Sequence, residues 1–246
     1  MLATRVIVPR GGDGCLSHFH HAPRLRLRLR QPGRRVLTTG ALSRDVPPLT
    51  RPDDVMEKHR FAQYAHWVVP GLVMAGRYPY VEPSRCLDKT VAQAQLEEIV
   101  GAGMDTFVCL QKELPLQKDI PVIGARGFKA YRPAVLDLRG EDTRFLYLPI
   151  TDLDIPSLED LDTYVAAVKA EVEDGRNVYI HCWGGRGRAA ILSACLLGEI
   201  YDELSPDEVL ERIQMYYDTR QDDGKRSPET PQQRGLIREY VAKLRS

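Results

Sequence analysis

The chain has 246 residues, enough for one sizeable domain with short appendages, and its 34 basic and 34 acidic side chains cancel. The neutral total hides an asymmetry: residues 1–51 hold ten arginines against two aspartates, a net charge of +8, which leaves −8 on the rest of the chain. Such an acidic body disfavours nucleic acid as a partner. The five cysteines have neither paired nor metal-ligand spacing, which fits a reducing compartment.

The first 50 residues are rich in arginine, poor in acidic side chains and free of any long apolar run. This composition is typical of an organelle transit peptide, and it excludes a secretory signal and a membrane span. The alternation of arginine and leucine over residues 24–30 has a period of two, which does not favour an amphipathic mitochondrial helix, and low serine does not favour a plastid signal. We predict that residues 1–50 are a transit peptide or a disordered basic tail. The location is then a mitochondrion or plastid in the first case and the cytoplasm in the second.

Apolar patterning predicts strands that alternate with helices after residue 60. Strands are expected at 73–75, 106–110, 145–148 and 177–180, and helices at 91–102, 158–173 and 189–198. Residues 111–141, rich in proline, glycine and charge, indicate a long loop with an edge segment at 128–131. Ser205 and Thr230 each begin a further helix. The alternation indicates an α/β fold with a central, mostly parallel sheet flanked by helices.

Residues 181–188 read His-Cys-Trp-Gly-Gly-Arg-Gly-Arg and lie between an apolar, β-branched strand and an apolar helix. Glycines let a backbone turn its amides inward, and a ring of amides capped by a helix N-terminus binds anions. Thiols beside helix N-termini and cations have pKa values of roughly 3.5–7.5 instead of about 8.5, so they ionise at neutral pH. The pattern therefore predicts a thiolate nucleophile at Cys182 and phosphate as the anion.

Arg188 completes the predicted phosphate site, because a planar guanidinium binds two phosphate oxygens at once. The residues between it and the nucleophile form the expected phosphate-binding loop: Trp183, Gly184, Gly185, Arg186 and Gly187. The alternative is a buried cysteine beside a glycine turn. The spacing of Arg188 and the strand–loop–helix context favour the phosphate site.

Four stretches together resemble a known family: residues 67–79, 148–152, 181–188 and 227–234. Over roughly residues 64–243 the chain is similar to the cysteine-dependent protein phosphatases of the tyrosine and dual-specificity class, above all to the compact bacterial-type dual-specificity phosphatases. The resemblance implies a phosphatase domain over residues 60–246. It also implies hydrolysis of phosphomonoesters through a phosphocysteine intermediate, with no cofactor and no metal.

The resemblance also assigns roles. A carboxylic acid on a separate loop protonates the leaving oxygen, which accelerates the reaction by about 10²–10⁴-fold. Asp152 matches that position in the family, and Asp154 is the alternative, which a helix-capping role explains better. His181 shapes the loop and helps to keep the thiolate without transferring protons to substrate.

Two features depart from the family pattern, and the role of a third is undecided from the sequence. Ala189 and Ala190 stand where most relatives carry a hydroxyl that stabilises the departing thiolate, which predicts slow hydrolysis of the phosphoenzyme. Arg186 replaces an apolar residue and is either an extra phosphate-binding cation or a solvated loop residue. Gln232 and Gln233 are candidates for positioning water, although a helix capping box explains Gln233 without a catalytic role.

The substrate implied is a phosphorylated protein or a small phosphoester, with no nucleic acid and no stable membrane insertion. One alternative is a phosphate-binding pseudophosphatase. Another is a phosphatase of phosphoinositides or other non-protein phosphoesters. A third is a thiolate enzyme such as an arsenate reductase, which needs a resolving cysteine, and Cys195 lies thirteen residues after Cys182 in the predicted helix.

Overall fold

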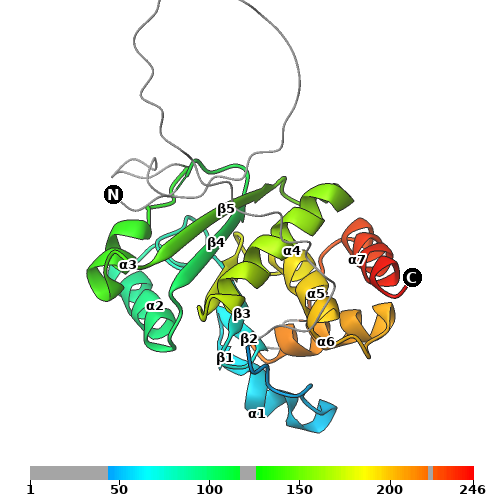
Figure 1. Ribbon diagram of the computed structural model, residues 1–246. Helices are drawn as coiled ribbons and strands as arrows, with labels where there is room; N and C mark the ends of the chain where they lie inside the picture. The colour runs from blue at the N-terminus through cyan, green and yellow to red at the C-terminus, as the bar shows by residue number, and fades with distance from the viewer. Residues whose placement is uncertain (1–43, 117–125, 221–223) are drawn as a thin grey trace, which may run out of the picture.

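The structure is a computed structural model that describes residues 44–116, 126–220 and 224–246 (Figure 1). Most of the predicted transit peptide or basic tail lies outside the described residues, as does Cys15. Predictions on that segment therefore remain predictions.

The described residues contain one six-stranded sheet, with spatial order β1-β2-β3-β6-β4-β5. Its strands are β1 (Arg60–Ala62), β2 (Ala65–Val69), β3 (Val73–Gly76), β4 (Thr106–Gln111), β5 (Arg144–Ile150) and β6 (Val178–His181). Strands β3, β6, β4 and β5 run parallel, whereas β1 and β2 add an antiparallel edge. The prediction of a mostly parallel sheet holds for the four-strand part. The short connections before β2 and β3 permit only antiparallel pairing there, so the sheet is mixed.

Helices cover both faces of this sheet. They are α1 (Val55–His59) after a 3₁₀ turn, α2 (Lys89–Gly101), α3 (Arg132–Arg139), α4 (Leu158–Glu173), α5 (Arg188–Ile200), α6 (Pro206–Asp218) and α7 (Pro231–Leu244). Ser205 and Thr230 cap α6 and α7 in capping boxes, as expected from the sequence. Helix α3 corrects the prediction of a loop over residues 111–141, and residues 128–131 contribute two buried rings, Phe128 and Tyr131, instead of an edge strand.

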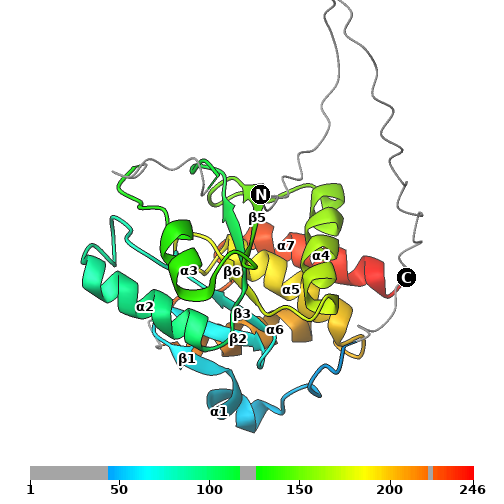
Figure 2. The ribbon, with the colours of Figure 1, turned by 60° about the vertical axis from the view of Figure 1, so that its left-hand side comes forward.

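Alternate residues along the central strands divide the core into two layers. In β6, Val178 and Ile180 face a cluster with α4, α5, α6 and α7, whereas Tyr179 faces an aromatic cluster with α2 and α3. Figures 1 and 2 show α2 and α3 on one side of the sheet and α4 to α7 on the other. The sheet is therefore buried on both faces, which explains why its strands read as continuous apolar runs.

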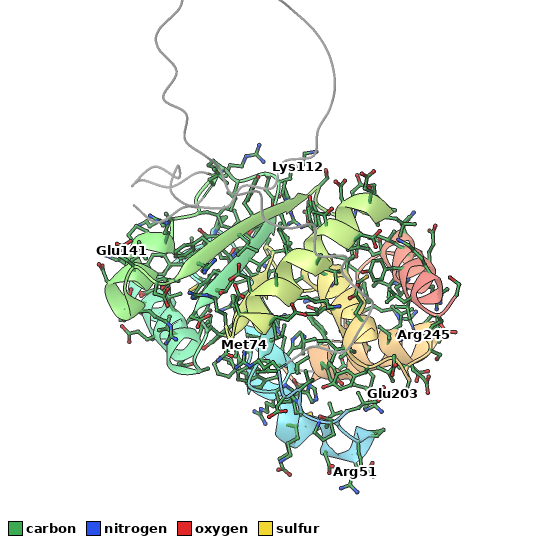
Figure 3. All side chains as sticks on the ribbon, in the orientation of Figure 1. Arg51, Met74, Lys112, Glu141, Glu203 and Arg245 are labelled. Carbon is green, nitrogen blue, oxygen red and sulfur yellow. The ribbon has the colours of Figure 1, made fainter. Side chains whose placement is uncertain are left out.

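Most charged side chains lie on the outside of this body, and Glu82, Arg188 and Arg220 are among the buried exceptions. Met74 in β3 is fully buried, whereas Arg51, Glu141 and Glu203 are exposed (Figure 3). Within the described ranges, no helix combines the length and the apolar character needed to cross a bilayer.

The carboxyl ends of the four parallel strands meet at one edge. Gly76 at the end of β3 and Cys109 in β4 both pair with His181, the last residue of β6. The segments that follow β3, β4, β5 and β6 therefore emerge side by side. Open α/β sheets bind their ligands at such an edge.

Residues 44–50 belong to the folded body, which differs from the boundaries predicted at residues 50 and 60. The Arg44 guanidinium donates to the Arg176 carbonyl at 2.8 Å, and the Tyr201 hydroxyl donates to the Pro47 carbonyl at 2.8 Å. Val46 and Leu49 pack against the core. These partners are more than a hundred residues away along the chain, so composition alone does not reveal the contacts.

Deletion of residues 1–43 should leave the thermal midpoint and the catalytic activity unchanged. Deletion of residues 1–50 should lower the free energy of unfolding by about 2–3 kcal/mol, because it exposes the core beneath Val46 and Leu49 and removes the hydrogen bond from Tyr201. The corresponding fall in midpoint is about 5–10 °C for a domain of this size, measured by circular dichroism. Equal midpoints for the two deletions would show that residues 44–50 contribute nothing to stability.

Candidate active site

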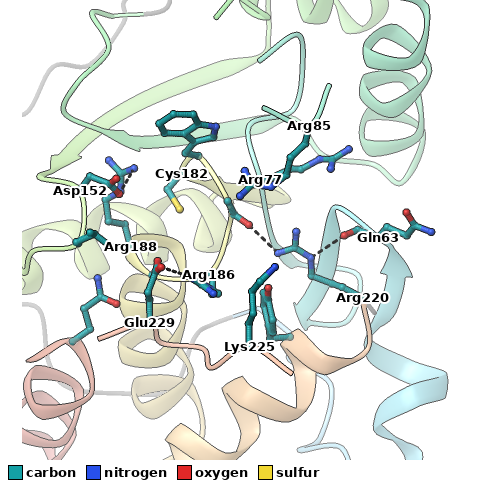
Figure 4. Close-up of a pocket in the computed structure, with 16 residues that line it drawn as sticks. Gln63, Arg77, Arg85, Asp152, Cys182, Arg186, Arg188, Arg220, Lys225 and Glu229 are labelled. Atoms are coloured by element: carbon teal, nitrogen blue, oxygen red, sulfur yellow. Dashed lines mark hydrogen bonds and ion pairs between the residues drawn. The ribbon is translucent and has the colours of Figure 1, made fainter. Parts of the chain in front are cut away.

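A cavity of about 290 Å³ opens at the carboxyl edge of the sheet (Figure 4). Cys182, Arg188 and Asp152 line it together with every residue of the loop 183–187 except Gly185. The structure thus brings the predicted nucleophile, phosphate-binding arginine and acid candidate into one pocket.

The loop 182–187 wraps around the sulfur of Cys182. The Gly185 amide donates to the Cys182 Sγ at 3.2 Å. Gly185 has a φ of +69°, and a Cβ there would overlap the Gly76 backbone and lie 2.7 Å from the Arg77 amide nitrogen. Only glycine permits both the backbone conformation and the close approach to β3. The resembling stretch 67–79 therefore forms the floor of the loop.

Arg220 holds the loop from the opposite side, and sequence reasoning missed it. This guanidinium is only 8% exposed, and its Nη1 donates to the carbonyls of Gly184 and Gly185 at 3.2 and 3.3 Å. Because these carbonyls point outward to Arg220, the neighbouring amides are free to point inward. Burial lowers the pKa of Arg220. Nothing in the local pattern around residue 220 marks it as a partner of residues 184 and 185.

Trp183 lines the cavity and is anchored to a buried carboxylate. Its indole Nε1 donates to the Glu82 Oε2 at 2.7 Å, and its carbonyl accepts from the Tyr78 amide at 3.0 Å. Burial alone would raise the pKa of Glu82, but hydrogen bonds from Ser84, Trp183 and the Arg85 amide outweigh it and lower that pKa. An ionised Glu82 thus fixes the segment after β3 against the loop.

Arg188 is almost fully enclosed, with 1% exposure. Its two terminal nitrogens contact the Glu113 carboxylate at 2.6 and 3.0 Å, and Nη2 lies 2.9 Å from the Asp152 Oδ1. Burial alone would lower the pKa of Arg188, but the hydrogen bond to Glu113 and the electrostatic attraction of the groups around the guanidinium outweigh it and raise that pKa. Glu113 was missed because it falls in the segment read as a loop.

Asp152 and Asp154, the two candidates for the general acid, lie in clearly different environments. Asp152 follows β5, lines the cavity and contacts Arg188. The Asp154 side chain accepts a hydrogen bond from the Ile155 amide, and its carbonyl accepts from the Gln233 Nε2. Asp152 therefore faces the sulfur-containing pocket, whereas Asp154 stabilises its own loop.

His181 is fully buried directly before the nucleophile. Its Nε2 lies 2.8 Å from the Tyr131 hydroxyl. Burial, with a smaller contribution from the Arg188 charge, lowers the pKa of His181 to about 3 despite an opposing hydrogen bond at Cys182. The ring is neutral at physiological pH, which suits a structural role behind the loop.

Arg186 lines the pocket but is not a solvated loop residue. It forms an ion pair with Glu229, and the Ser227 hydroxyl donates to its carbonyl at 3.0 Å. The resembling stretch 227–234 thus closes the loop on the side of α7. A nearby carboxylate therefore balances the positive charge of Arg186.

The structure also gives the positions of the glutamines and alanines whose roles the sequence left undecided. Gln233 is buried, lines the cavity and completes the capping box of α7, whereas Gln232 is exposed outside the cavity. Ala189 and Ala190 are buried in the first turn of α5. Among the described residues there is no cluster of three or more histidine, cysteine and acidic side chains that could hold a metal.

The other described cysteines are poor nucleophiles. Burial raises the pKa of Cys109 to about 12 and the pKa of Cys195 well above its ordinary value. Cys195 is fully buried in α5, so it is not placed to resolve an oxidised or arsenylated Cys182.

The fold and this loop define a class of protein, and comparison with known proteins identifies it. The sequence profile of the "Swiss Army Knife protein, DSP-PTPase phosphatase domain" family matches residues 62–222. The chain belongs to this family of dual-specificity and tyrosine phosphatase domains.

Curated relatives match over parts of their length. The chain is 28% identical over 156 residues to cyclin-dependent kinase inhibitor 3 of Rattus norvegicus, which covers 62% of this chain and 64% of that protein. It is 43% identical over 53 residues to an uncharacterized protein of Methanocaldococcus jannaschii, which covers 22% of this chain and 36% of that one. The chain therefore spans between 36% and 64% of the length of these two relatives.

Solved structures share the fold. PTPMT1 in complex with PI(5)P superposes with a TM-score of 0.52 at 18% identity, over 74% of this chain and 97% of that one. Kinase associated phosphatase, with its catalytic cysteine replaced by serine, superposes with a TM-score of 0.51 at 19% identity. The match covers 71% of this chain and 88% of that one. At these identities the comparison supports the α/β architecture alone.

Gly185→Ala should destroy the loop, because the alanine would need a left-handed backbone and would collide with Gly76. We expect activity to fall about a hundredfold or more, since displacement of a reacting group by about 1 Å has that effect. Gly184→Ala is the matched control, because its Cβ would lie no closer than 3.7 Å to another group. For both variants, activity is measured as phosphate release from an aryl phosphate, and stability is measured by thermal unfolding. Equal activity in the two would contradict the packing of Gly185 on Gly76.

Proposed function

We propose that the chain is a phosphomonoester hydrolase that acts through a phosphocysteine intermediate, with phosphorylated protein as substrate. The observation that carries this proposal is the Cys182 sulfur, which accepts a hydrogen bond from the Gly185 amide within the loop that ends at Arg188. Membership of the phosphatase family supports it.

In the first proposed step, the Cys182 thiolate attacks phosphorus in line with the leaving oxygen. An S–P bond forms, the P–O bond breaks, and Asp152 transfers a proton to the leaving oxygen. The loop amides and Arg188 stabilise the equatorial oxygens. Phosphate bound by Arg188 replaces its contact with Asp152, which leaves that carboxyl beside the leaving group.

In the second proposed step, water attacks phosphorus, Asp152 accepts its proton, and the S–P bond breaks to release phosphate and the thiolate. Gln233 lines the pocket where this water would enter. Since Ala189 supplies no hydroxyl, the Gly185 amide and the N-terminus of α5 are the groups left to stabilise the departing thiolate.

A second candidate is a phosphatase of phosphoinositides or other non-protein phosphoesters. The cationic lining of the pocket favours it, and the similar fold of PTPMT1 has been solved with PI(5)P. A pseudophosphatase is the third candidate, and only the alanine after Arg188 favours it. For location, the composition of the first 50 residues supports a mitochondrion or plastid, with the cytoplasm as the alternative.

Cys182→Ser should abolish phosphate release, by at least about a thousandfold, while the fold is retained, because a serine hydroxyl has no accessible anion at neutral pH. The measurement is phosphate release from an aryl phosphate, with circular dichroism as the folding control. Substantial activity in the variant would exclude the cysteine mechanism. A wild-type chain that binds phosphate analogues but releases nothing would instead identify a pseudophosphatase.

Asp152→Asn and Asp154→Asn form a matched pair that tests the general acid. The first should lower kcat by about 10²–10⁴-fold on substrates with poor leaving groups, and less on those with good ones, because the acid matters most where the leaving oxygen is basic. The second should lower kcat by less than about threefold, since its carboxylate bonds only its own loop. Steady-state kinetics over a series of aryl phosphates distinguishes them. The reverse ranking would move the acid role to Asp154.

A further inference from the structure

Positive charge is concentrated around the Cys182 pocket. Six cationic side chains line it against two carboxylates: Arg77, Arg85, Arg186, Arg188, Arg220 and Lys225 against Asp152 and Glu229. Because the chain after residue 51 has a net charge of −8, this concentration is local and not a property of the whole surface.

One side of the pocket is balanced in charge. Asp152 contacts Arg188, and Glu229 contacts Arg186, so both lining carboxylates are taken up by these two cations. The extra loop cation at residue 186 is therefore not the group that would bind a further anion.

The opposite side carries arginines whose described contacts are all with neutral groups. Arg77 donates to the Gln95 Oε1 at 2.8 and 3.2 Å and lies over the Tyr64 ring. Arg85 donates to the Ser84 hydroxyl at 3.1 Å, and Arg220 donates to backbone carbonyls. A cation held by neutral partners keeps its full attraction for an incoming anion.

These arginines lie close to the phosphate loop. The guanidinium of Arg85 lies near Gly184, because a Cβ placed on that glycine would be 3.7 Å from the Arg85 Nη2. Arg77 and Arg220 also line a neighbouring cavity of about 520 Å³, so they stand where the two cavities meet. Figure 4 shows Arg77, Arg85 and Arg220 on the side of Cys182 away from Asp152 and Arg188.

We infer that Arg85 and Arg77, in the field of Arg220, bind a second phosphate of the substrate beside the phosphate that Cys182 removes. The inference rests on the proposed phosphatase activity and specifies its substrate class, a compact phosphoester with phosphates on adjacent atoms. A free polyol phosphate and a phospholipid headgroup both present this chemistry. The second phosphate is bound and not cleaved, so the two proposed steps are unchanged.

The closeness of the two anion sites favours a compact substrate over a doubly phosphorylated peptide. The Arg85 guanidinium lies near Gly184 in the loop that would hold the first phosphate, so a second phosphate bound by Arg85 lies within the reach of one side chain. Neighbouring ring or polyol carbons hold two phosphates at such a spacing without ordering a peptide backbone, which has an entropic cost.

The test compares three aryl substrates that differ only in the second phosphate: phenyl phosphate, catechol bisphosphate with adjacent phosphates and hydroquinone bisphosphate with opposite ones. We expect kcat/KM for catechol bisphosphate to exceed the other two by about tenfold. Arg85→Gln should reduce that preference by about threefold to tenfold. The matched control is Lys89→Gln, an exposed residue outside the pocket that removes the same charge and should leave the preference within about twofold.

Failure of this inference is distinguishable from failure of the proposed function. If the wild-type chain does not hydrolyse phenyl phosphate, the proposed function is wrong, and calorimetric binding of catechol bisphosphate against phenyl phosphate to Cys182→Ser still tests the subsite. The inference is overturned if the wild-type chain has no preference, or if Arg85→Gln keeps it. It is also overturned if Lys89→Gln loses the preference equally, or if a doubly phosphorylated peptide is preferred to catechol bisphosphate. A comparison of phosphatidylinositol bisphosphate in vesicles with its free headgroup then identifies the source of the paired phosphates. Whichever of the two is hydrolysed faster is the preferred form, and either result supports the inference.

Discussion

The carbonyls of Gly184 and Gly185 point to the buried guanidinium of Arg220, and the rest of the site depends on that orientation. A peptide unit whose oxygen faces one way presents its N–H to the other, so a cation behind the loop directs amides toward the sulfur. The Gly185 amide then reaches Cys182, and the close contact of Gly185 with Gly76 leaves no room for another conformation. The proposed anion site is therefore built mostly from backbone, with one buried cation behind the loop as its support.

Arg188 connects this loop to the strands on the other side. Its guanidinium contacts Glu113 after β4, the Ile150 carbonyl at the end of β5 and Asp152 beyond it. These contacts exist because parallel strands bring their carboxyl ends to one edge of the sheet. Under the proposed mechanism, a phosphate that binds Arg188 would replace the contact of Arg188 with Asp152 and so free the carboxyl of Asp152 to act as the acid.

Charge in the pocket is distributed unevenly, and this bears on substrate choice. Arg186 and Arg188 have carboxylate partners. By contrast, an amide holds Arg77, a hydroxyl holds Arg85 and backbone carbonyls hold Arg220. Neutral partners fix the position of a guanidinium without reducing its charge. The side of the pocket beside β3 is thus prepared for a further anion, in a domain that is otherwise acidic.

The sequence alone determined the strands β3, β4, β5 and β6, the helices α2, α4, α5, α6 and α7, and the loop 182–188, because periodicity, capping residues and glycine spacing are local properties. Helix α3, the antiparallel β1–β2 edge and the packing of residues 44–50 were missed, since short segments take their structure from distant partners. In the site, Cys182 and Arg188 are recognisable from one contiguous motif, and Asp152 from the family resemblance. Glu113, Arg220 and the pairing of Arg186 with Glu229 were decided only by the tertiary structure. Their roles come from contacts across at least 35 residues of sequence, which no local pattern encodes.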